Sequence, residues 1–348
     1  MFSLLLILAV DLGPIAPEAP GREPQLAANS SLVALTFGAG NAVYFSASHD
    51  VGRTFSAPVK VGQAGVLPLN RHRGPRIAVS KGTIVISAVT GRKLVEGPHA
   101  HGLPADGDLI AWRSSDGGKT WSKGVNINDV PAAPREGLHT LAADDSGNLF
   151  AAWLDQRASG TRLFGSYSSD RGATWSQNVP IHDGTVCECC HPSAAFLPGG
   201  GIAVMWRNWL DGARDLYLAR SRDSRHFEKP EKLGQGTWRL NACPMDGGGL
   251  AVSENHVVTA WRREDGVFLA EPDMPETRIG TGKDVALAAG RDGVYAVWSH
   301  GARIEVWHAG KTSVLAEHGA FPAITSLPDG GVLAAWEENG GVAWRRLP

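Results

Sequence analysis

The sequence lacks the features that define several large classes of protein. Its 33 lysine and arginine residues nearly balance 35 aspartate and glutamate residues, so the net charge is −2 and no basic face is available for a nucleic-acid partner. No apolar run reaches the roughly 18 residues that a membrane-spanning helix needs. No glycine pattern of a nucleotide-binding loop occurs. We therefore expect no transmembrane segment, no nucleic-acid partner and no nucleotide cofactor.

Glycine and proline are abundant instead. The chain of 348 residues has 43 glycines and 21 prolines, a composition typical of many short strands joined by tight turns. A chain of this length is longer than an average domain. A repeat protein of the same length can nevertheless be one closed unit.

The N-terminal segment allows two interpretations. Residues 2–10 form a short apolar run, and a proline-rich stretch follows at 14–24. A signal peptide has such an apolar core, although no lysine or arginine precedes this one and no clear cleavage site follows it. The alternative is a strand that helps to close the fold. We expect residues 1–21 to be a signal peptide or an N-terminal closing strand, residues 22–348 to be a single domain, and the protein to be periplasmic or secreted.

Three segments of the chain repeat one another closely. They read S-H-D-V-G-R-T-F at 48–55, S-S-D-G-G-K-T-W at 114–121 and S-S-D-R-G-A-T-W at 168–175, and a degenerate fourth copy reads S-R-D-S-R-H-F at 221–227. The aspartate can accept backbone N–H bonds across a hairpin turn, and the glycine supplies a positive φ. We expect the final aromatic residue to fold under the turn and plug its own blade. These aspartates are therefore predicted to be structural, not catalytic.

A second repeat has the same period. Short apolar runs ending in tryptophan follow glycine-rich turns and occupy residues 150–153, 203–206, 258–261, 295–298 and 333–336. One unit then consists of strand A, a turn, strand B with its tryptophan, a loop, strand C, the aspartate segment and strand D. Radial repetition of four antiparallel strands is the pattern of a β-propeller. The tryptophans are expected to pack between blades.

The repeats predict an all-β propeller with seven blades. The blades lie near residues 22–62, 73–129, 135–184, 187–234, 240–280, 284–316 and 319–348, and the last has three strands. A merged pair among the shorter final repeats would reduce the number to six.

The repeated segments resemble the Asp-box, or BNR repeat, of the sialidase-like propeller superfamily, over essentially the whole chain. Catalytic sialidases of that superfamily have six blades, an arginine triad, an aspartate acid/base, a tyrosine nucleophile with a glutamate partner, and an F/Y-R-I-P motif. This chain has P-R-I-A at 75–78, and its four tyrosines are all predicted to lie inside strands: Tyr44, Tyr167, Tyr217 and Tyr295. The resemblance therefore implies the fold and supplies no nucleophile for sialidase chemistry.

One face of the predicted propeller collects the unusual residues. The Asp-boxes are C–D turns and mark the back, so the D–A and B–C connections form the front, where binding residues on a rigid scaffold gather. The ligand-binding candidates on this face are His72, Arg73, Arg135, His139, Arg207, Asn208, Trp238 and Asp246.

All four cysteines also belong to this front face. The candidate metal ligands are Cys187, Cys189, Cys190, His191 and Cys243. The segments 187–192 and 241–247 resemble motifs of a non-standard bacterial sialidase-like subgroup with a C-x-C-C-H motif. Thiolates and imidazole suit a soft metal ion such as copper or zinc. Disulfides and inert buried thiols are the alternatives.

A metal site makes a specific geometric demand. At least three sulfurs should converge on one point, with or without His191. Regular strand alternation would separate Cys189 from Cys190, so the inner strand must begin irregularly.

The sequence thus leaves three functions open. The first is an exported propeller with a Cys/His copper or zinc site that supports redox chemistry. The second is a glycan-binding or glycan-hydrolysing propeller, similar to an exo-α-sialidase, with structural disulfides. The third is a protein-interaction scaffold. In each case we expect a monomer, with a metal ion, a glycan or another small molecule as the ligand in the first two.

Overall fold

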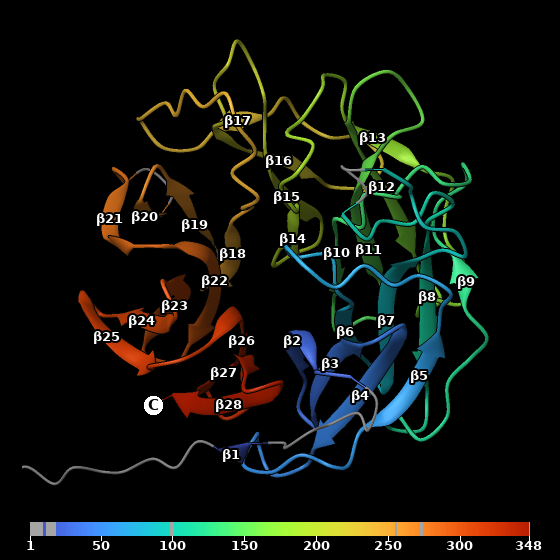
Figure 1. Ribbon diagram of the computed structural model, residues 1–348. Helices are drawn as coiled ribbons and strands as arrows, with labels where there is room; N and C mark the ends of the chain where they lie inside the picture. The colour runs from blue at the N-terminus through green and yellow to red at the C-terminus, as the bar shows by residue number, and fades with distance from the viewer. Residues whose placement is uncertain (1–9, 12–18, 98–100, 255, 272–273, 348) are drawn as a thin grey trace, which may run out of the picture.

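The computed structural model describes residues 10–11, 19–97, 101–254, 256–271 and 274–347, and these form an all-β propeller (Figure 1). Seven four-stranded antiparallel sheets are arranged radially as blades. The prediction of seven blades is confirmed, and the six-bladed alternative is wrong. Within the described residues, no helix is long and apolar enough to cross a membrane.

Each of the first six blades is built from four strands that are consecutive in sequence. The first three blades contain β2 (Arg22–Ala28), β3 (Val33–Ala39), β4 (Ala42–Ser48), β5 (Val59–Gln63), β6 (Arg76–Ser80), β7 (Thr83–Thr90), β8 (Asp108–Ser114), β9 (Val125–Asn126), β10 (His139–Ala143), β11 (Leu149–Asp155), β12 (Arg162–Ser168) and β13 (Val179–His182). The next three contain β14 (Ser193–Phe196), β15 (Ile202–Arg207), β16 (Leu216–Ser221), β17 (Glu231–Lys232), β18 (Gly249–Ser253), β19 (His256–Arg263), β20 (Gly266–Ala270), β21 (Thr277–Thr281), β22 (Lys283–Gly290), β23 (Gly293–His300), β24 (Arg303–His308) and β25 (Lys311–Ala316).

The seventh blade combines the two ends of the described chain. It contains β26 (Ala320–Ser326), β27 (Val332–Glu338), β28 (Gly341–Leu347) and β1 (Val10–Asp11). In β1, Val10 pairs with Trp344 of β28, and the strand order is β1-β28-β27-β26. Residues 1–9 and 12–18, most of the segment predicted to be a signal peptide or closing strand, lie outside the described residues. Cleavage of that segment stays a prediction.

The first strand of each blade lies nearest the axis, and these inner strands contact one another around the ring. The core therefore consists of layers between adjacent blades. The strand-B tryptophans fill these layers, as predicted. Trp153 of the third blade, for example, is fully buried in one cluster with Val85 and Val89 of the second blade.

The Asp-boxes occupy the C–D turns, as predicted. In the second blade, Ser114 Oγ donates to Asp116 Oδ1 at 2.8 Å and accepts the Gly118 N–H at 2.9 Å. The same carboxylate accepts the N–H groups of Lys119 and Thr120 at 3.0 Å each, and Thr120 Oγ1 donates to Oδ2 at 2.6 Å. These hydrogen bonds lower the pKa of Asp116, and the one from the Thr120 side chain has the largest effect. The carboxylate of this box aspartate is thus held by hydrogen bonds within its own turn.

The aromatic residue of each box does more than plug its own blade, so that expectation was incomplete. Trp121 of the second blade packs edge-on against Phe45 of the first, with ring centroids 5.3 Å apart. Phe55 of the first blade meets Trp344 of the seventh at 5.1 Å. The cause lies in the box glycine: a Cβ on Gly118 would clash with the Phe45 ring, so the turn itself is pressed onto the preceding blade. Each box therefore joins two blades.

Candidate metal centre

Three chain connections meet at one face of the fourth and fifth blades. The cysteine-rich segment links β13 to β14, the Cys243 segment links β17 to β18, and residues 208–215 link β15 to β16. The first two are D–A connections and the third is a B–C connection. In an antiparallel blade these leave from the same edge. All four cysteines therefore lie on the front face.

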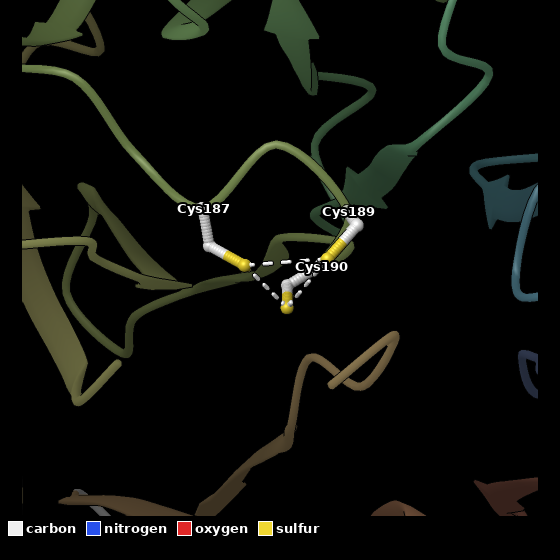
Figure 2. A group of neighbouring side chains, drawn as sticks. All are labelled: Cys187, Cys189 and Cys190. Atoms are coloured by element: carbon white, nitrogen blue, oxygen red, sulfur yellow. Dashed lines mark hydrogen bonds between the residues drawn. The ribbon is translucent and has the colours of Figure 1, made fainter. Parts of the chain in front are cut away.

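The cysteine-rich segment enters its blade irregularly, as the geometric demand required. The Cys187 N–H donates to the Arg207 carbonyl at 3.0 Å, which ties the segment to the end of β15. Glu188 and Cys189 then form a turn, and β14 begins only at Ser193. This turn brings neighbouring side chains to one side, and Figure 2 shows the three thiols converging.

The three sulfurs form a compact, buried triangle. The Sγ atoms of Cys187 and Cys190 are 2.8 Å apart, those of Cys187 and Cys189 are 3.6 Å apart, and those of Cys189 and Cys190 are 4.0 Å apart. Three thiolates bound tetrahedrally at about 2.3 Å from a zinc ion would lie about 3.8 Å apart. All three residues are buried, and all four cysteines are free thiols. The cluster has the donor type and size to hold a metal ion.

The electrostatics of the triangle concentrate negative charge on one sulfur. Burial alone would raise the pKa of Cys187, but hydrogen bonds from the Cys189 and Cys190 thiols outweigh it. The Arg214 guanidinium, 3.1 Å from Cys187 Sγ, adds to this effect and lowers the pKa of Cys187 to about 3. Hydrogen bonding and burial raise the pKa of Cys189, and burial raises that of Cys190. Of the three thiols, that of Cys187 therefore loses its proton most readily.

Cys243 approaches from the next blade and belongs to a second group. Its thiol is exposed and donates to Glu188 Oε1 at 3.3 Å. The ligand atoms of Glu188, Cys189 and Cys243 all lie within 4.8 Å of one another. Arg214 fixes Glu188 through both terminal nitrogens, at 3.3 and 3.4 Å. Cys189 is therefore shared between a buried group and an exposed group.

His191 lines a cavity at the propeller axis, next to His72. Its ring stacks on that of His72 with centroids 4.4 Å apart, and both line a cavity of about 190 Å³. His72 Nε2 lies 2.9 Å from Asp284 Oδ1. Burial would lower the pKa of His72, but Asp284 raises it, whereas burial and the charge of His72 lower that of His191. His191 is outside the two groups of potential metal ligands found among the described residues.

Asp246 completes this axial cluster. It is fully buried, and its Oδ2 accepts the Asp284 N–H at 3.2 Å while Oδ1 has no hydrogen-bond partner. Burial and the nearby Asp284 raise the pKa of Asp246. The sequence-predicted candidates His72, His191 and Asp246 therefore meet one another at the axis, and none of them is in the two groups of potential metal ligands among the described residues.

The other ligand-binding candidates brace the loops of the front face. Arg73 is buried and donates from Nε to the Glu136 carbonyl at 2.7 Å. His139 is buried, with Nε2 3.0 Å from Ser87 Oγ. Arg135 is half-buried in the same D–A connection.

The candidates beside the cysteines are buried as well. Arg207 donates to backbone carbonyls, including that of Asp246 at 2.9 Å, and Asn208 pairs with Val186 in an isolated bridge. Trp238 lies beneath the guanidinium of Arg207, with Cζ 5.2 Å from the ring centroid. These side chains support the walls of the site.

Sequence reasoning missed three features of the site. Cys187 and Cys190 are spaced as C-x-x-C, and they make the closest sulfur contact. Glu188, between the cysteines, was not counted as a ligand. Met245 packs against the three thiols and adds a soft thioether. The spacing of Cys187 and Cys190 and the positions of Glu188 and Met245, close to cysteines in the sequence, could have indicated these features.

Comparisons with known proteins support the fold. The chain matches no protein-family model and no curated protein. It is similar to a Dyadobacter fermentans protein of unknown function, with a TM-score of 0.56, 17% identity and 98% of both chains covered. The intramolecular trans-sialidase of Ruminococcus gnavus has a TM-score of 0.56 and 12% identity, covering 97% of this chain and 96% of its own. A Penicillium chrysogenum α-L-arabinanase complexed with arabinobiose has a TM-score of 0.54 and 16% identity, with 97% of both chains covered.

Proposed function

We propose that this sialidase-like β-propeller binds a soft metal ion, copper or zinc, through Cys187, Cys189 and Cys190. The observation that carries the proposal is the convergence of three buried sulfurs within 4.0 Å of one another. Thiolates are soft ligands that favour Cu(I) and zinc over magnesium or calcium. A metal ion bound by these three sulfurs would be three-coordinate, or four-coordinate with one further ligand.

The charge around the sulfurs supports a cation at this point. A cluster of three thiolates would be strongly unfavourable in a buried position without positive charge. Arg214 contacts Cys187 Sγ at 3.1 Å. The charge of the buried Arg207 favours the thiolate of Cys190, but burial has the larger effect, and the pKa of Cys190 is raised overall. These arginines supply part of the positive charge, and a metal ion would supply the rest. Inert, protonated thiols would need neither the arginines nor a metal ion beside them.

The proposal also fits the predicted location of the protein. The apolar run at 2–10 favours export to an oxidising compartment, where free thiols usually form disulfides. Metal binding converts thiols to ligating thiolates and protects them from that reaction. In our proposal, the site is therefore loaded in the periplasm or outside the cell.

A competition titration tests this function. Reduced protein is titrated with Zn²⁺ and, separately, with Cu(I) against a chromophoric chelator. We expect one tightly bound ion per chain, and loss of that ion in each of the variants Cys187→Ser, Cys189→Ser and Cys190→Ser. Ala242→Ser, a serine at an exposed position of the same face, is the control. Wild-type protein that binds neither ion more tightly than the triple cysteine variant would refute the proposal.

A second candidate function is glycan binding, which one groove favours. The groove has a volume of about 650 Å³ and is lined by Trp209, Arg239 and Asn241, among others. Trp209 is 45% exposed and presents a face on which a sugar ring can stack, and Arg239 can pair with an acidic sugar. Trp209→Ala should abolish quenching of tryptophan fluorescence by sialic acid or arabino-oligosaccharides. Leu210→Ala should not, and an absence of quenching in the wild type would exclude this candidate.

A further inference from the structure

A buried metal site needs a path by which the ion reaches it. Cys187 and Cys190 have 0% and 1% of their surface exposed, so an ion in water cannot contact them directly. Cys189, at 5%, lies at the edge of the cluster. Of the four cysteines, which all lie within the described residues, only Cys243 is exposed.

The second ligand group provides that path. Glu188, Cys189 and Cys243 place their ligand atoms within 4.8 Å of one another, and Cys243 Sγ is 3.3 Å from Glu188 Oε1. The Glu188 side chain is 36% exposed, and Arg214 holds it in place through two contacts. This group is therefore preformed and accessible to water, and it shares Cys189 with the buried triangle.

We propose that Glu188, Cys189 and Cys243 form a loading position from which a metal ion is transferred to Cys187, Cys189 and Cys190. This inference rests on the proposed metal binding. During transfer Cys189 stays bound, the bonds from the ion to Cys243 Sγ and to the Glu188 carboxylate break, and bonds to Cys187 and Cys190 form. No electron is transferred, each thiol that becomes a ligand releases its proton to solvent, and Cys243 takes up a proton from solvent when the ion leaves its sulfur. Three thiolates hold a soft ion more tightly than two thiolates and a carboxylate, so the ion moves inward.

A kinetic experiment separates a loading position from a permanent ligand. Apo protein is mixed with Zn²⁺ bound to a chromophoric chelator in a stopped-flow instrument, and the loaded protein is then challenged with excess chelator. A residue used only on the path changes the rates of loading and removal by the same factor and leaves the Kd unchanged. A residue that ligates the final site changes the Kd.

The variants are Cys243→Ser and Glu188→Gln, with Ala242→Ser as the matched control. We expect Cys243→Ser to slow both loading and removal by about tenfold or more, which corresponds to about 1.4 kcal/mol on the barrier. Its stoichiometry and Kd should equal those of the wild type, and Glu188→Gln should have a smaller effect of the same kind. Cys243 is exposed, so we expect its serine variant to fold normally, which thermal unfolding checks.

The remaining outcomes overturn the inference in distinguishable ways. Wild-type rates in Cys243→Ser would show that loading uses another path, and the metal site itself would stand. A weakened Kd or lost stoichiometry in Cys243→Ser would make Cys243 a permanent ligand and remove the loading position. Absence of metal from the wild type would overturn the proposed function and this inference together.

Discussion

Buried His139 makes the stability of the propeller depend on pH. Its side chain is enclosed at the start of β10, with Nε2 3.0 Å from Ser87 Oγ and Nδ1 3.2 Å from the Gly137 carbonyl. Burial, and then the nearby charge of Arg76, lower the pKa of His139 from 6.5 to about 3. The imidazole is therefore neutral in the folded protein between about pH 5.5 and pH 7.5.

The sign and size of the effect follow from this shift. The unfolded chain takes up a proton at His139 below about pH 6.5, and the folded chain does not. The contribution of His139 to the free energy of unfolding is therefore fully present above that pH and is lost as the pH falls. Between pH 7.5 and pH 5.5 the loss attributable to His139 is about 1.4 kcal/mol. In His139→Gln the glutamine cannot titrate, so this part of the pH dependence should disappear.

Urea unfolding of the metal-free, reduced protein at the two pH values measures the effect. The comparison is between the wild type, His139→Gln and the exposed control His318→Gln. The pKa of His191 is lowered and that of His72 is raised. Both residues are present in all three proteins, so their effects drop out of the comparison. His318→Gln should follow the wild type. If His139→Gln lost as much stability as the wild type on acidification, the buried neutral imidazole would be a misinterpretation.

Further measurements address the boxes, the cluster and the enzyme class. Ser114→Ala removes the acceptor of the buried Gly118 N–H and should lower the free energy of unfolding by about 1–3 kcal/mol in urea. Asp116→Ala should also destabilise the protein while metal stoichiometry stays unchanged; a stable variant that loses metal would contradict a purely structural role. Met245→Leu should weaken Cu(I) binding more than Zn²⁺ binding in the competition titration, because a thioether is a soft ligand. Hydrolysis of an aryl sialoside should equal the blank, and turnover abolished by Tyr217→Phe would reverse that conclusion.

The fold could be predicted from the sequence because its determinants are local. The Asp-box needs only a serine, an aspartate and a glycine in one turn, and its hydrogen bonds close within five residues, as at Ser114–Gly118. Tryptophan-containing runs marked strand B in the same register. The four tyrosines lie in strands, as expected. What the local pattern did not contain is the contact of each box with the preceding blade.

The candidate site could be predicted only in part, since its geometry depends on contacts between distant segments. The cysteines meet because the Cys187 N–H is held by Arg207 and the turn at Glu188 redirects the chain, as the predicted irregular start allowed. The direction of His191 could not be derived, because it is set by stacking on His72, more than a hundred residues away. Trp238 is buried beside Arg207, and its role as a ligand contact stays a prediction. Loop residues carry no periodicity from which such burial can be predicted.

X-ray absorption spectroscopy at the copper and zinc edges, on protein purified without a chelator, tests the central claim most directly. The account predicts one ion per chain with about three sulfur ligands at about 2.3 Å, and loss of this signal in Cys187→Ser and Cys190→Ser. Titration should then find the three clustered thiols unreactive until the ion is removed. Protein that contains no copper or zinc while all four thiols react freely, or an ion bound only through nitrogen and oxygen, would contradict it.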